Sequence, residues 1–377
     1  MPNSLHRQNG AIAITSMLLL MTLLGFSAIA FDISHLLLVR NELQNDADAA
    51  ALAGANCLSK TTAASGTNCT STPSSTLNWS VASTTATDSI GLNKSDGIHL
   101  TNGTIETGYF DINGGSVLQP TSLSPFGPCT VTGGVMTSAC DKPAVKVTVN
   151  RSNGSNGGPV GTLIASIFGG SAAPITASAI AVISSPSGML PGTLMPEAIN
   201  KCLFDLYFDL SNNLPKLATS ANLNGVAQVI GQPWKVRIGS AYRYPACDSG
   251  QWTSFEKNDN SASYIKKLIK NGNPNQLNIG DKIYIQSGTV DSFYDELLKA
   301  YPLAGIDIFM PVIDYPDGLN GATSMIPIIG FASFHIDAIK GGSDKYIEGY
   351  FNLGMTIGGF SGTGPYYGAY TPARLAK

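Results

Sequence analysis

An uninterrupted apolar run near the N-terminus constrains this chain more than any other feature. Residues 11–31, AIAITSMLLLMTLLGFSAIAF, contain no charged side chain. A helix of this length extends about 30 Å, which is the thickness of the hydrocarbon core of a bilayer. We therefore predict a transmembrane helix over residues 11–31. A secretory leader is the alternative, because Ala28-Ile29-Ala30 offers a small-residue cleavage site.

The apolar run continues into a polar segment without a helix-breaking residue. Residues 32–58, DISHLLLVRNELQNDADAAALAGANCL, contain no proline and many strong helix formers. We therefore predict one helix over about 11–58. Three- and four-residue spacings place six apolar or small positions on one face of it, which are Leu36, Val39, Leu43, Ala47, Ala50 and Gly54. Two interpretations of this face stay open: it covers a sheet of its own domain, or it packs on neighbouring subunits during assembly.

Charges on the two sides of the run indicate its orientation. His6 and Arg7 precede it, whereas Asp32, Arg40 and Glu42 follow within the next turns. The positive-inside bias predicts that residues 1–10 form a short cytoplasmic N-terminus and that the rest of the chain is extracytoplasmic.

Composition limits the class of partner. Charged residues make up 12% of the chain, about half the usual share, and the net charge is -3. Such a surface gives no reason to expect a nucleic-acid partner.

The chain contains six cysteines, which fall into neighbouring pairs. Local pairing is the simplest connectivity and predicts three disulfides: Cys57 with Cys69, Cys129 with Cys140, and Cys202 with Cys247. Metal ligation is the alternative, but neither a CxxC pair nor a histidine cluster accompanies these cysteines. Disulfides indicate an oxidising compartment.

The region after the helix has a mixed pattern. Residues 59–89 are rich in Ser and Thr and predict an exposed loop, whereas 103–112, 144–151 and 175–184 have the alternation of strands. Residues 32–185 thus predict an extended helix with a pilin-like antiparallel β domain.

A second domain is predicted beyond a Pro- and Gly-rich linker at residues 186–196. Residues 197–377 combine helical patterns at 261–272 and 290–301 with several strands, which predicts a β-rich α+β domain built as a sandwich or partly open barrel. The whole chain is therefore expected to be α+β.

The N-terminal residues resemble a known family. The sequence of residues 7–55, including VRNELQNDADAAALAGA at 39–55, is similar to the N-terminal region of TadG-like proteins of the tight adherence (Tad/Flp, type IVb) pilus assembly system. The resemblance implies an inner-membrane, single-pass component of a bacterial pilus machine. It implies other Tad assembly proteins or pilin-like subunits as partners, and a minor pilin-like (pseudopilin) role.

Two departures from family patterns qualify what the resemblance implies. Type IV prepilins are cut after a glycine and carry Glu at the fifth mature position. Here Gly10 and Ala11 offer the cleavage site, but Thr15 stands at the fifth position, so processing stays open. Some TadG-like members carry a von Willebrand A metal site with Asp-x-Ser-x-Ser, but Leu36 follows Asp32 and Ser34 here. We therefore expect this chain to be of the type without that domain, and to have no metal site and no cofactor.

Two features of the C-terminal part could indicate a catalytic or an adhesive function. His335 and Asp337 alternate on a predicted strand, and GGFSGTG places Ser361 in an incomplete Gly-x-Ser-x-Gly turn. These are weak signals, so we expect no enzyme. The alternative to a structural component of pilus biogenesis is a surface or pilus-tip adhesin, with four aromatic candidate contacts: Trp252, Tyr366, Tyr367 and Tyr370.

Overall fold

A computed structural model describes most of the chain. The described residues are 9–62, 69–73, 77–112, 117–122, 131–132, 135–136, 141–162, 164, 166, 169, 172–209, 214–240, 247, 249–286, 291–301, 305–315, 325–352, 355–362 and 366–376. They form two compact units. The described residues of the first unit lie within 1–51, 86–105 and 146–179, and those of the second within 52–85, 106–145 and 180–377.

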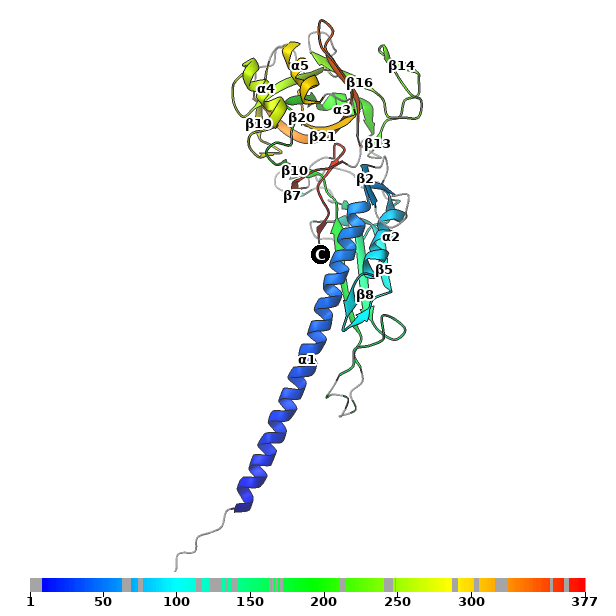
Figure 1. Ribbon diagram of the computed structural model, residues 1–377, viewed down its shortest axis with the longest axis vertical. Helices are drawn as coiled ribbons and strands as arrows, with labels where there is room; N and C mark the ends of the chain where they lie inside the picture. Colours follow the sequence, from blue (N-terminus) through cyan, green and yellow to red (C-terminus); the bar gives the residue numbers. More distant parts are fainter. Residues whose placement is uncertain are drawn as a thin grey trace, which may run out of the picture. The chain divides into compact units, whose positions relative to one another are not determined.

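A single long helix opens the structure. Helix α1 (Asn9–Cys57) has 49 residues and includes the whole apolar run (Figure 1, blue). It is long and apolar enough to cross a membrane. The rest of the chain is rich in strands, so the expectation of an α+β fold with a long N-terminal helix is confirmed.

A four-stranded sheet follows in the order β26-β9-β8-β5. Its strands are β5 (Gly103–Asp111), β8 (Asp141–Arg151), β9 (Ile175–Val182) and β26 (Arg374–Leu375). In β8 the side chains of Val145, Val147 and Val149 are fully buried, as their alternation predicts. Strand β26 pairs antiparallel with β9, so the C-terminal end of the chain completes this sheet.

The Ser- and Thr-rich segment is partly helical, which corrects the prediction of an exposed loop over residues 59–89. Helix α2 (Trp79–Ile90) follows the short hairpin of β1 (Lys60–Thr62) and β2 (Cys69–Pro73). Ala82, Ala86 and Ile90 lie four residues apart on one helical face and are buried. The prediction was wrong because small residues such as alanine give a weak helical period among many Ser and Thr.

The C-terminal part contains a seven-stranded sheet whose pairings close on themselves. Its order is β11-β20-β21-β19-β17-β16-β22, and β11 also pairs with β17 while β22 pairs with β21. The circuit β11-β20-β21-β22-β16-β17 is therefore a closed barrel, which removes exposed strand edges. The strands are β11 (Glu197–Asn200), β16 (Val236–Ser240), β17 (Ser249–Phe255), β19 (Lys282–Ile285), β20 (Ile306–Ile313), β21 (Met325–Lys340) and β22 (Tyr346–Phe351).

Three helices accompany the barrel: α3 (Lys201–Tyr207), α4 (Ala262–Asn271) and α5 (Asp291–Ala300). Helices α4 and α5 pack against each other, and contact β17 and β21 respectively (Figure 1). The predicted linker includes β10 (Pro186–Met189), which pairs with β18 (Leu277–Asn278) and β24 (Gly359–Ser361).

Short two-stranded pairs complete the described structure. They are β3 (Lys94–Ser95) with β4 (Ile98–His99), β6 (Val131–Thr132) with β7 (Val135–Met136), β12 (Phe208–Asp209) with β13 (Leu214–Pro215), β14 (Asn222–Leu223) with β15 (Val226–Ala227), and β23 (Met355–Thr356) with β25 (Ala369–Tyr370).

A buried acid lies among the barrel strands. Glu197 on β11 is 1% exposed, and a Cβ atom at Gly250 on β17 would collide with its carboxylate. Burial raises the pKa of Glu197 to about 8. The glycine therefore provides the space that this carboxyl group occupies.

Candidate functional site

The outer surface of α1 forms a long apolar belt. Its large apolar side chains are more than half exposed, from Ile12 at 66% to Leu38 at 57%. The belt members are Ile12, Ile14, Met17, Leu18, Leu19, Leu20, Met21, Leu23, Leu24, Phe26, Ile29, Phe31, Ile33, Leu37 and Leu38. Water-facing helices carry polar residues on such a surface, so the belt is suited to a lipid environment.

Asp32 is the single charged residue within the belt, and its side chain does not face outward. The residue is 6% exposed, and its carboxylate accepts hydrogen bonds from the Ile164 backbone amide, at 3.3 Å for Oδ1 and 3.1 Å for Oδ2. An exposed carboxylate at this level would oppose membrane insertion. The fold therefore hides the one charge that the belt contains. Ser34, the other part of the incomplete metal motif, donates its hydroxyl to the Ala30 carbonyl at 2.7 Å.

A group of polar contacts around Asp96 lies beside α1 just beyond Asp32. His35 Nε2 lies 3.1 Å from Asp96 Oδ1, and Arg151 Nη1 lies 3.8 Å from Asp96 Oδ2. Glu42 Oε2 accepts a hydrogen bond from the Asp96 amide at 2.7 Å. Asp96 has a φ of 53°, a left-handed conformation that Asp tolerates better than most residues. One turn residue thus ties α1 to the strands beside it.

The predicted assembly face of α1 is mostly buried within the chain itself. Leu36 is half-buried, and the five other members are buried: Val39, Leu43, Ala47, Ala50 and Gly54. Of the two interpretations left open by the sequence, this burial supports a helix that covers its own fold. Asp46 on the same stretch accepts a hydrogen bond from Asn93 Nδ2 at 2.5 Å, and burial raises its pKa to about 6.

The predicted processing site lies at the start of α1. Gly10 is in the first turn of the helix, which begins at Asn9, and the Thr15 hydroxyl donates to the Ile12 carbonyl at 3.0 Å. This geometry does not decide cleavage between Gly10 and Ala11, which stays open.

Two of the three predicted disulfides fall within the described residues. Cys57 is bonded to Cys69, and Cys202 to Cys247. Cys129 and Cys140 lie outside the described residues. In the described part of the chain, no group of three or more His, Cys, Asp or Glu residues is arranged to hold a metal ion.

His335 is held between the carboxylates of Asp307 and Asp337. Its Nδ1 lies 2.7 Å from Asp307 Oδ1, its Nε2 lies 3.7 Å from Asp337 Oδ1, and Asn352 donates to Asp307. The ring also stacks on Tyr350 at 4.8 Å between centroids. Sequence reasoning missed Asp307 as the partner, because only the register that sets Asp307 opposite His335 between β20 and β21 brings them together.

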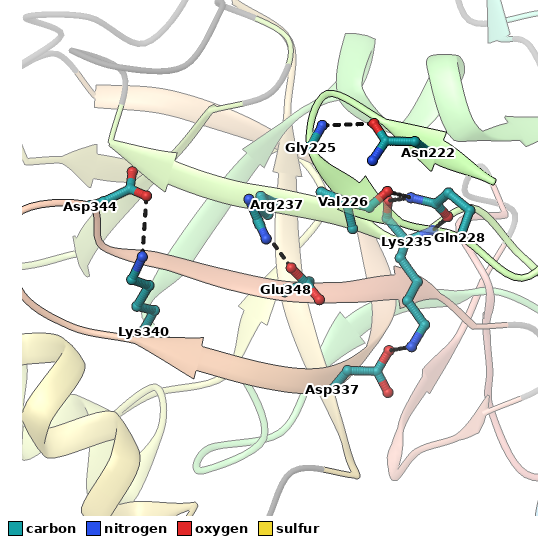
Figure 2. A network of polar contacts seen from close by, with 10 residues as sticks. All are labelled: Asn222, Gly225, Val226, Gln228, Lys235, Arg237, Asp337, Lys340, Asp344 and Glu348. Atoms are coloured by element: carbon teal, nitrogen blue, oxygen red, sulfur yellow. Dashed lines mark hydrogen bonds and ion pairs between the residues drawn. The ribbon is translucent and has the colours of Figure 1, made fainter. Parts of the chain in front are cut away.

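The outer side of the barrel near β16 and β22 carries a network of paired charges (Figure 2). Arg237 Nε meets Glu348 Oε2 at 2.7 Å across the β16–β22 pair, and Lys235 Nζ meets Asp337 Oδ2 at 2.8 Å. Gln228 bridges the approach to β16 by accepting from the Lys235 amide and donating to its carbonyl, both at 2.8 Å. These charged side chains are therefore paired with each other and are not offered to a ligand by this geometry.

The four aromatic candidates for ligand contact in the adhesin alternative are buried. Trp252 is 1%, Tyr366 6%, Tyr367 3% and Tyr370 1% exposed. Trp252 packs edge-on against Phe293 and Tyr294, and burial raises the pKa of Tyr370 well above its ordinary value. These aromatic side chains therefore belong to the core, in which aromatic residues are as common as they are at interfaces.

Two family models match the part of the chain that contains the belt and most of the four-stranded sheet. Residues 10–56 match the Tad model, described as Flp pilus-assembly TadE/G-like, and residues 41–181 match the Tad_C model, described as Tad-like Flp pilus-assembly. No curated protein and no solved structure matches the chain.

Proposed function

We propose that this chain, a TadG-like protein of the Tad/Flp pilus-assembly system by its family matches, is a membrane-anchored structural component of pilus biogenesis. In this proposal α1 crosses the bacterial inner membrane once, residues 1–10 are cytoplasmic, and the remaining chain is extracytoplasmic. The role is non-enzymatic and that of a minor pilin-like subunit. Its partners are other Tad assembly proteins or pilin-like subunits.

The observation that carries the anchoring is the belt on α1 together with the position of Asp32. A continuous set of exposed apolar side chains with its only charge turned inward matches the solvent properties of a bilayer. The disulfides Cys57–Cys69 and Cys202–Cys247 support an oxidising compartment for the bulk of the chain.

A topology experiment tests the anchoring and the orientation. Full-length protein with a C-terminal epitope is expressed in the native host, and its membranes are washed with alkaline carbonate. We expect the protein to stay in the membrane, and protease added to spheroplasts to remove the epitope. Release by carbonate would contradict the anchor, and a protected epitope would contradict the orientation.

Mass spectrometry of the mature N-terminus tests the pilin-like role. A start at Ala11 would support prepilin-type processing, whereas a start at Met1 or Pro2 would support a fixed anchor without it. A start at Phe31 would show that the apolar run is removed as a leader, and would overturn the anchoring.

A deletion strain separates the structural role from adhesion. The structural role predicts loss of pili when the protein is missing. Intact pili that no longer attach to a surface would instead favour the adhesin alternative, for which the buried aromatic residues supply no contact surface.

A further inference from the structure

A hollow lies beside α1 close to the end of the apolar belt. It has a volume of about 370 Å³ and is formed between Ile33, Leu36, Leu37 and Arg40 of α1 and residues 173–176, which lead into and begin β9. Apart from Arg40 and Thr176, the lining side chains are apolar, and Ile33 and Leu37 are more than half exposed. The volume is near the lower limit of ordinary ligand pockets.

The hollow lies on α1 just after the predicted transmembrane residues 11–31. The exposed belt ends at Leu38, and Arg40 follows two residues later on the exposed surface. Side chains on a helix point back toward its N-terminus, so the Arg40 guanidinium reaches toward the belt. An arginine at this position is suited to contact headgroups while its stem lies along apolar surface.

Arg40 takes part in no ion pair or side-chain hydrogen bond with the described residues. Three acids of this region already have partners. Asp32 accepts from the Ile164 amide and Glu42 from the Asp96 amide, and the Asp96 carboxylate lies beside His35 and Arg151. The hollow therefore combines an apolar wall with one available cation.

We propose that this hollow binds one membrane phospholipid, whose acyl chain lies between Leu37 and Ala173 and whose phosphate is bound by Arg40. The inference rests on the proposed anchoring of α1, because it needs the bilayer at this level. An arginine binds a phosphate through charge-assisted hydrogen bonds, and a flexible acyl chain suits an open apolar hollow.

A second copy of the chain is the less suitable occupant. Two parallel copies of α1 would place two Arg40 side chains at one level in the same interfacial layer, where like charges repel. Compensation would need acids at this level, and Asp32 and Glu42 of α1 already accept hydrogen bonds from the Ile164 and Asp96 amides.

Native mass spectrometry tests the proposal. The full-length chain is reconstituted into vesicles of equal parts phosphatidylcholine and phosphatidylglycerol, washed with carbonate, and released in mild detergent. We expect a population with one retained phospholipid. Arg40→Gln is expected to lower this population about tenfold, as loss of one charge-assisted contact would.

Two further variants make the test specific. Lys94→Gln removes the same charge from an exposed position outside the hollow and is expected to keep the lipid. Ala173→Trp fills the hollow and is expected to exclude the lipid. Equal lipid retention in Arg40→Gln and the unaltered chain would overturn the site, as would the absence of any retained lipid.

The remaining outcomes separate this site from the anchoring. Disulfide-linked dimers of Leu37→Cys in vesicles, formed without retained lipid, would identify a second copy as the occupant and overturn the proposal. Failure of the unaltered chain to stay in washed vesicles would instead overturn the proposed anchoring, and this inference with it.

Discussion

The backbone amide of Ile164 donates a hydrogen bond to the carboxylate of Asp32, with 3.1 Å between the amide nitrogen and Oδ2. The two residues are separated by 132 positions in the chain. This contact holds the only charged side chain among the belt residues inward, away from the exposed surface, and it also satisfies a backbone donor. It therefore couples the folding of the chain around α1 to the lipid compatibility of the helix.

Asp32→Leu is expected to free the Ile164 amide while leaving the belt apolar. Loss of a buried acceptor costs about 1–3 kcal/mol, so hydrogen exchange at Ile164 should accelerate about tenfold or more. Membrane retention after a carbonate wash should not change. Asp48→Asn, which alters an acid that accepts from Gln44 one turn away, is the control. Unchanged exchange at Ile164 would contradict the role of this contact.

Asn156→Ala is expected to destabilise the first unit by about 3 kcal/mol, because several buried hydrogen bonds are lost together. Asn156 Oδ1 accepts from the amides of Thr101 and Asn102, at 2.8 and 3.0 Å, and its Nδ2 donates to the carbonyls of Asn102 and Asn150. Its φ of 47° also disfavours alanine.

Thermal unfolding in detergent measures this effect. The neighbouring exposed variant Asn153→Ala should change stability by less than about 0.5 kcal/mol. Equal melting temperatures for the Asn156 and Asn153 variants would show that the hydrogen bonds of the Asn156 side chain do not contribute to stability.

Glu197 is expected to make stability depend on pH. Its pKa rises from 4.5 to about 8 on burial, so between these values the unfolded chain is ionised while the folded chain keeps the proton. The unfolded state then binds fewer protons, and stability falls as the pH rises from about 4.5 to 8, by a few kcal/mol in total.

Glu197→Gln, which cannot ionise, should lose this part of the slope. Melting curves of the two proteins across that pH range make the comparison, and Glu256→Gln serves as an exposed control. Parallel pH profiles for the Glu197 variant and the unaltered chain would contradict a buried neutral acid.

The disulfide Cys202–Cys247 is expected to stabilise the chain more than Cys57–Cys69. The two cysteines of the first disulfide are separated by 45 residues in the chain, and those of the second by 12. Loop-closure entropy gives about 4 kcal/mol for the longer loop and about 3 kcal/mol for the shorter. Melting temperatures of the two paired Cys→Ser variants test the order. A smaller loss for Cys202→Ser/Cys247→Ser than for the other pair would contradict it.

Long periodic segments allowed prediction of much of the fold. The apolar run with its proline-free continuation predicted α1, and the alternation of Val145, Val147 and Val149 predicted β8 with one buried face. Both signals are local, since helix and strand periods depend on the spacing of apolar residues. Helix α2 was not predicted from its period, because Ala82 and Ala86 are small and lie among Ser and Thr.

Contacts between distant segments could not be read from the pattern. The His335–Asp307 pair needs the register of β20 against β21, and β26 reaches β9 from the far end of the chain. For the aromatic residues near the C-terminus, the choice between a core and a binding surface depends on what covers them, which the sequence pattern does not contain.

The amino-acid sequence by itself determined the apolar helix, the α+β class, the local cysteine pairs in the described residues and the resemblance to TadG-like proteins, because each depends on residue type and short spacing. Tertiary structure alone decided that Asp32 turns inward, that Glu197 occupies the space above Gly250, and that Arg40 is left beside an apolar hollow. These outcomes depend on which backbone groups and cavities distant segments bring together, and burial then sets the energy and the protonation of each charged group.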